Sequence, residues 1–140
     1  MREILFRGKI TDTKEWIEGV AFPHDNNKVT MLSQHPMDGS LVGKEIDPET
    51  VGQYTGLTDK NSVKIFEGDV VRCVSRLDYA NMIVIFEDGE FRMVKCEDYK
   101  TYTTGNGYFS LRCFHKEVIG NIYDNPELLG GVNDETDRCG

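Results

Sequence analysis

The stretch that decides the fold is QYTGLTDKNSVKIFEGDVV, which spans residues 53–71. It contains two sets of turn formers, Gly56 and the cluster Asp59-Lys60-Asn61-Ser62. Glycine adopts positive φ angles freely, and Asp, Asn and Ser side chains bond to nearby backbone groups. A tight Glu67-Gly68-Asp69 reversal then leads into a strand-like run over residues 70–75. The stretch therefore predicts short β-strands joined by tight turns.

Strand-like runs continue on both sides of this stretch, where apolar and polar residues alternate. Asp88-Gly89 lies between two such runs and is a strong hairpin signal. A capping residue precedes proline at two places. At Asn125-Pro126 this predicts a one-turn helix, and at Asp47-Pro48 it predicts either one helical turn or an extended edge segment. The predicted strands cover residues 3–10, 16–22, 29–32, 70–75, 82–86, 91–94, 108–114 and 117–123.

Residues 53–71 resemble the signature of the YopX family, small proteins of phages and prophages of mainly Gram-positive bacteria. Four further segments resemble the family's sequence: residues 2–9, 16–19, 47–56 and 117–129. Ser62 stands where the family commonly has glycine after asparagine, which indicates a longer loop than a two-residue Asn-Gly turn. The resemblance implies a fold and a biological setting, and it implies no particular biochemical activity.

We expect a mostly β protein: a small SH3-like barrel with an N-terminal β extension and one or two short helical turns. Residues 1–129 should form a single domain, in which the extension ends at about residue 50 and the barrel covers about 51–129. Residues 130–140 are polar, Gly-rich and acidic, and we expect this tail to be disordered.

The composition and the N-terminus predict a globular cytoplasmic protein, and the resemblance to YopX proteins implies a bacterial host. The 140 residues can form a core without metal or disulfide support, and no apolar run approaches the ~18 residues of a membrane span. Met1-Arg2-Glu3 precedes strand-like sequence and does not resemble a signal peptide. The net charge is −8, with eight basic and twelve acidic side chains in each half, residues 1–70 and 71–140. This balance argues against general nucleic-acid binding, because binding to phosphates requires a positive surface.

No cofactor, metal site or catalytic set is expected. Cys73, Cys96, Cys113 and Cys139 lack the Cys-x-x-Cys spacing of zinc sites and are interpreted as reduced thiols. Glu67 and Asp69 could act as an acid/base pair, but we favour a structural use of both carboxylates at the turn. We expect a protein that is not an enzyme, with a small hydrolase as an alternative.

Two candidate binding surfaces emerge from the second half of the chain. Residues 82–86 are apolar on both faces, so the N-terminal segment or another subunit should cover the second face. Tyrosines interleaved with basic residues suit single-stranded nucleic acid, which needs rings for stacking and cations for phosphates. The candidate interface strand is Met82, Val84 and Phe86; the candidate binding loop is Tyr79, Tyr99, Tyr102, Tyr108, Arg76 and Lys100.

We interpret the signature residues as structural: Tyr54, Gly56, Asp59, Phe66, Gly68 and Asp69. The favoured function is a non-catalytic protein-binding or self-assembling module, whose partner is a copy of itself or a host protein. The first alternative is a single-stranded nucleic-acid-binding barrel. The second is an acidic mimic that blocks a host nucleic-acid-binding protein.

Overall fold

The computed structural model describes residues 3–76, 78–103, 105–112 and 115–129. Cys113, Cys139 and the tail at 130–140, for which disorder was expected, lie outside these residues. The chain divides into two compact units, Met1–Gly56 and Leu57–Gly140. The division falls close to the boundary near residue 50 at which the barrel was expected to begin.

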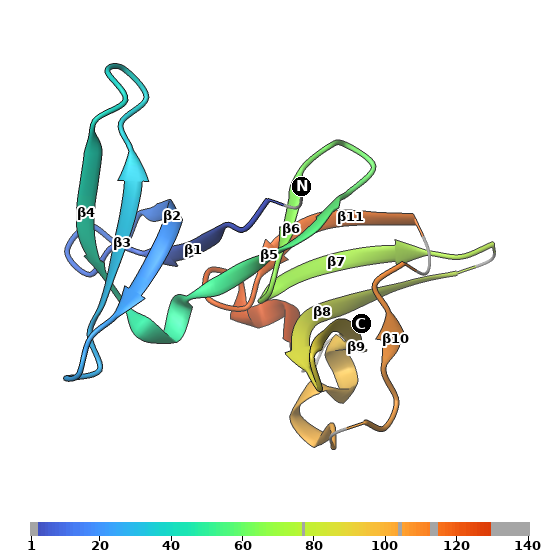
Figure 1. The fold of residues 1–140 in the computed structure, drawn as a ribbon. Coiled ribbons are helices and arrows are strands. Elements are labelled where there is room, and N and C mark those ends of the chain that lie inside the picture. Colours follow the sequence, from blue (N-terminus) through green and yellow to red (C-terminus); the bar gives the residue numbers. More distant parts are fainter. Residues whose placement is uncertain (1–2, 77, 104, 113–114, 130–140) are drawn as a thin grey trace. The chain divides into compact units, whose positions relative to one another are not determined.

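The first unit is an antiparallel meander (Figure 1). Its strands continue into β6 of the second unit through β5, giving the strand order β4-β3-β2-β1-β5-β6. Asp47 caps η1 by accepting a hydrogen bond from the Glu49 N–H, as the Asp-Pro pair predicts. The elements are β1 (Phe6–Lys9), β2 (Trp16–Pro23), β3 (Val29–Gln34), β4 (Leu41–Ile46), η1 (Pro48–Thr50) and β5 (Gly52–Thr58).

The second unit contains an antiparallel sheet in the order β10-β9-β8-β7-β11. The Asp88-Gly89 pair forms the β8–β9 turn, as predicted, and both residues have positive φ angles. The elements are β6 (Lys64–Phe66), β7 (Asp69–Val74), β8 (Tyr79–Glu87), β9 (Glu90–Lys95), η2 (Cys96–Thr101), β10 (Phe109–Ser110), β11 (His115–Asn121) and η3 (Pro126–Leu129).

Strands β7 and β8 are buried on both faces, because two hydrophobic clusters sandwich them. Tyr99 of η2 and Leu128 and Leu129 of η3 pack on the second cluster. The cover for the second face of β8 therefore includes two short helices of the chain's own second unit. The first cluster is Ile65, Val71, Cys73, Met82, Val84, Met93 and Leu111, and the second is Val70, Ile83 and Cys96.

The mostly β class is confirmed, but the expected SH3-like barrel is not: the strands form two antiparallel sheets that do not close. Strand β10 has only two residues, and β11 lies at the opposite edge of its sheet. The helices η1 and η3 lie where helical turns were predicted, whereas η2 replaces a predicted loop. None of the helices in the described part is long and apolar enough to span a membrane.

Candidate functional site

The Asp59 carboxylate joins the signature loop to β11. One oxygen, Oδ1, accepts hydrogen bonds from the backbone N–H groups of Asn61 (2.8 Å) and Val63 (2.9 Å), and Oδ2 accepts one from Val118 (2.9 Å). Burial alone would raise the pKa of the Asp59 carboxyl, but these three bonds outweigh it and hold the pKa below its usual value. Asp59 therefore stabilises the fold as an ionised acceptor.

The rest of this loop lies along the edge of β11. The Lys60 N–H donates to the Lys116 carbonyl at 3.1 Å. Ser62 adopts a φ of +66°, the left-handed region that favours glycine. The loop thus supplies hydrogen-bond partners to an edge strand, and such cover prevents unwanted strand pairing.

The Glu67-Gly68-Asp69 reversal is also held by backbone bonds. The buried Asp69 accepts a hydrogen bond from the Phe66 N–H at 2.8 Å. Gly68 donates to the Val84 carbonyl (2.8 Å) and accepts from the Ile122 N–H (3.0 Å), so it links β8 to the chain after β11. These contacts are consistent with a structural role for the signature.

The two remaining signature residues belong to β5, in the first unit. The Tyr54 N–H donates to the Leu5 carbonyl at 2.7 Å. Gly56 has a φ of +88° and has no atom within 4 Å of the position that a Cβ would occupy. Its requirement for glycine therefore comes from the backbone angle rather than from packing.

Two tyrosines of the predicted binding loop meet at a buried arginine. The Arg92 guanidinium donates to Glu87 and to Glu90, each at 2.7 Å, and lies 3.9 Å from the centre of the Tyr108 ring. The Tyr102 hydroxyl donates to the same Glu87 oxygen at 2.6 Å. Burial, followed by this hydrogen bond, raises the pKa of the Tyr102 hydroxyl. The hydrogen bond to Glu90, and after it the one to Glu87, raises the pKa of Arg92 although burial opposes this.

The other members of the predicted loop lie elsewhere. Tyr99 packs against the second hydrophobic cluster, and Arg76 and Lys100 are exposed. Tyr79 begins β8, while Glu87, the partner of Tyr102, ends it. Both ends belong to one nine-residue strand, so eight steps of ~3.3 Å separate these two positions by about 26 Å. The four tyrosines therefore do not form one surface.

The predicted interface strand is corrected by its burial. Met82 and Val84 lie within the first hydrophobic cluster and are inaccessible in the single chain. Phe86 alone of the three is exposed, at 49%, and it makes an edge contact with Phe91 at 4.9 Å between ring centres. The physical reason is that Ile65 of β6, Leu111 and Leu57, which lie outside β7, β8 and β9, pack against this face of β8.

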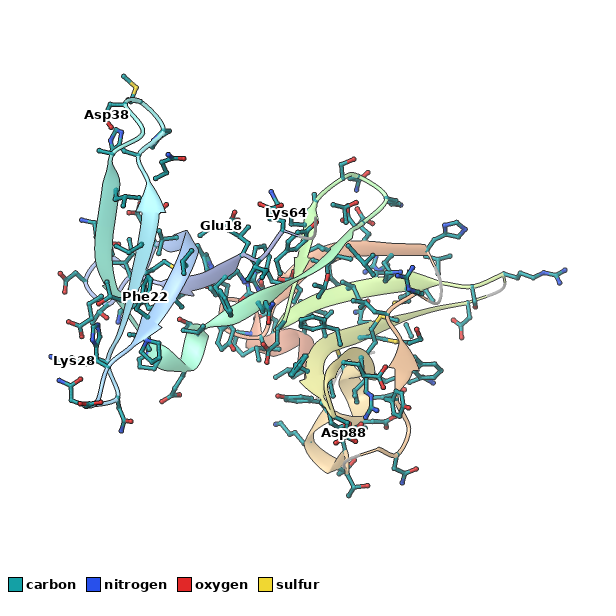
Figure 2. All side chains as sticks on the ribbon, viewed as in Figure 1. Glu18, Phe22, Lys28, Asp38, Lys64 and Asp88 are labelled. Atoms are coloured by element: carbon teal, nitrogen blue, oxygen red, sulfur yellow. The ribbon has the colours of Figure 1, made fainter. Side chains whose placement is uncertain are left out.

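An exposed apolar surface missed by the sequence interpretation lies on the first unit. Val20, Phe22 and Leu41 are 49%, 46% and 71% exposed. The strand register places all three on one face of β2-β3-β4, since directly opposed residues share a face: Val20 pairs with Leu32, Phe22 with Thr30, and Leu41 with Gln34. We call this the outer face; Figure 2 labels Phe22 on it.

The opposite face of β2-β3-β4 carries the fully buried Met31 and Ile46. Alternation at Val20 and Phe22 was visible in the sequence and predicted a strand. It could not indicate which face would be buried, because both faces carry apolar residues. Within the described part of the chain, no group of three His, Cys, Asp or Glu side chains could hold a metal ion.

Comparison with known proteins agrees with this architecture. The sequence profile described as "YopX protein" matches residues 5–130. The chain belongs to the YopX family. A crystal structure of protein EF1440 from Enterococcus faecalis has a similar fold, with a TM-score of 0.55 and 23% identity, covering 93% of this YopX chain and 100% of that chain. None of the curated protein sequences matches this chain.

Proposed function

We propose that this YopX-family chain is a non-catalytic protein-binding module that assembles with a second copy of itself through the outer face. The observation that supports this is the row of exposed apolar side chains, Val20, Phe22 and Leu41, on one face of a small sheet. Apolar residues gathered on one exposed face are typical of protein interaction sites, and an aromatic side chain commonly anchors them.

A second copy is favoured over another partner by the position of β4 (Leu41–Ile46), the edge strand next to these side chains. Ile10 and Thr11 of the same chain already pair with its end at Ile46 and Glu45, so the pairing would use the start of the strand, residues 41–44. Antiparallel pairing of an edge strand with its own copy about a two-fold axis is self-complementary. It would also join the two outer faces into one continuous surface, on which Val20, Phe22 and Leu41 of each copy are the exposed apolar side chains among polar ones such as Gln34 and Glu45. The action of such an assembly inside a bacterial host, as a phage or prophage product, is part of the proposal and is supported by the family membership.

Light scattering at micromolar concentration tests the proposal. The wild-type mass should be that of a dimer, and Phe22→Glu should reduce it to a monomer because the new carboxylate would be desolvated in the interface. Phe86→Glu is the matched control, since Phe86 is 49% exposed against 46% for Phe22 and lies on the second unit. This variant should stay dimeric. Two outcomes would reject the outer face as a self-association site. The wild type could be monomeric, or Phe86→Glu could be monomeric while Phe22→Glu stays dimeric.

A further inference from the structure

The second unit has a sheet face that its short helices cover only in part. On this face, η2 and η3 pack over Val70 and Ile83. Beyond them the register aligns two rows across β11, β7 and β8, in which four of the six residues are exposed: Arg72, Val74, Tyr79 and His115. The rows are His115-Val74-Tyr79 and Glu117-Arg72-Asn81. We call these six residues the open face.

The open face carries an exposed aromatic ring beside a guanidinium. Tyr79 is 61% exposed, and the Arg72 guanidinium lies 5.0 Å from the centre of its ring. Arg72 Nε also lies 3.5 Å from the Asn81 side-chain oxygen, so its position is fixed from two sides. The guanidinium lies over one face of the ring, so the other face is the one that can stack on a flat group, with the cation close by.

Positive charge gathers on the same side of the sheet. A groove of about 290 Å³ is lined by Lys60, Arg72, Val74, His115, Lys116 and Glu117. Glu117 is the one carboxylate among these six, and the Lys60 ammonium lies 3.7 Å from it. Lys116 pairs with Cys73, so its side chain belongs to the opposite face of the sheet. Lys60 and Arg72 against Glu117 still leave one positive charge in excess at the groove, in a chain whose net charge is −8.

A separate acidic cluster lies at the other end of β8. Glu87, Asp88 and Glu90 surround Arg92 at the β8–β9 turn, which Figure 2 marks by its Asp88 label. Tyr79 and Glu87 are the two ends of β8, so the length of the strand separates the cationic groove from this cluster. The overall negative charge is thus not a measure of the local charge at the open face.

A second cavity of about 410 Å³ continues from the open face toward η3. It shares Tyr79 and Asn81 with the open face, and Leu128 and Leu129 supply apolar walls. Asp78 and Glu97 also line it, so it favours an uncharged group over a phosphate. An uncharged, flat ring with polar edges, such as a nucleobase, suits the stacking ring of Tyr79 and the amide of Asn81.

We propose that the open face binds single-stranded nucleic acid, with phosphates at Arg72 and Lys60 and a base stacked on Tyr79. This site lies on the second unit and is independent of self-association through the outer face. It uses Tyr79 of the predicted tyrosine loop but neither Tyr102 nor Tyr108, because those two rings are engaged with Glu87 and Arg92. A single strand is favoured over a duplex because only unpaired bases present their faces for stacking.

Fluorescence anisotropy tests the proposal. It measures the affinity for a labelled single-stranded DNA of mixed sequence and for the same strand in a duplex. The single strand should bind more tightly at low salt. Tyr79→Ala should weaken binding about 5- to 140-fold, the range expected for the loss of one base–aromatic stack. Arg72→Gln should weaken it and reduce the slope of log K against log salt by about 0.7, the value for one phosphate contact on a single strand.

Controls separate this site from the alternatives. Lys100→Ala removes an exposed cation of the tyrosine loop and should leave binding unchanged, as should Phe22→Glu on the outer face. Absence of binding at low salt, or an equal loss with Lys100→Ala and Arg72→Gln, would overturn the proposal. A third outcome would assign the open face to an acidic protein instead. In that case polyglutamate would displace the DNA, and the Tyr79→Ala variant would bind DNA as tightly as the wild type does.

Discussion

The Asp59 carboxylate accepts a hydrogen bond from the backbone N–H of Val118 at 2.9 Å, although 59 residues separate them in the sequence. The same carboxylate closes its own loop through Asn61 and Val63. One side chain therefore fixes a local turn and attaches that turn to the edge strand β11. This dual use explains why an acidic residue within the signature can be structural, even though its position in a polar loop suggests recognition.

Replacing Asp59 by alanine should destabilise the protein strongly. Three backbone N–H groups would lose their acceptor, and hydrogen bonds to a charged group contribute about 1.5–3 kcal/mol each before local rearrangement. We expect a loss of on the order of 2–4 kcal/mol in the free energy of unfolding, measured by urea denaturation. Asp38→Ala is the matched control, because Asp38 also accepts from a turn N–H, that of Ser40, but is exposed. It should change stability little.

The contribution of Asp59 should also depend on pH. The pKa of Asp59 is lowered in the folded protein, so the ionised form is favoured by folding. Its contribution is complete above the unfolded pKa of about 3.9 and is lost as the pH falls through the lower folded pKa. The stability difference between wild type and Asp59→Asn should therefore shrink below about pH 4. A difference that stays constant from neutral pH to about pH 3 would show that the carboxylate acts without its charge.

How much the sequence could predict depended on the range of each interaction. The Asp88-Gly89 turn and the Asp47 cap follow from neighbouring residues, and both were predicted. The partner of Asp59 lies on β11 and could not be identified without the three-dimensional fold. The prediction of a closed SH3-like barrel failed for the same reason, because closure depends on which strands lie at the edges of each sheet. Tyr99 was assigned to a binding loop because its helix η2 has no amphipathic repeat long enough to detect.

The Arg92 cluster should hold the segment that contains Tyr102 and Gly105 against the β8–β9 hairpin. Arg92→Lys keeps the charge but cannot donate to Glu87 and Glu90 in the same planar arrangement. The Gly105 N–H donates both to the Glu87 oxygen and to the Tyr102 hydroxyl, each at 3.2 Å, so displacement of Glu87, which also holds Tyr102, should weaken the protection of that amide. We expect faster hydrogen exchange at Gly105 and a lower midpoint of thermal unfolding. Unchanged exchange at Gly105 would indicate that Tyr102 alone positions Glu87.

Gly68→Ala should destabilise the reversal before β7 for two separable reasons. Its φ is +93°, and an added Cβ would lie 3.1 Å from the Tyr123 ring. Gly56→Ala isolates the first reason, because its φ is +88° and no atom lies within 4 Å of the Cβ position. We expect a loss of about 1–2 kcal/mol at Gly56 from the backbone angle alone. The loss at Gly68 should be larger by about 1 kcal/mol or more, the usual cost of overpacking. Equal losses in urea denaturation would mean that Tyr123 moves aside freely.

Ser62→Gly should have the opposite sign. Ser62 adopts a φ of +66° in the loop that crosses the edge of β11, a region that costs a non-glycine residue about 1–2 kcal/mol. Glycine removes this strain but loses about 0.5–1 kcal/mol through the greater freedom of the unfolded chain. The net result should be a gain of up to about 1 kcal/mol in the free energy of unfolding. Ser33→Gly, within strand β3, provides the contrast and should lower stability. If both variants are destabilised equally, the loop does not hold Ser62 in the left-handed region in solution.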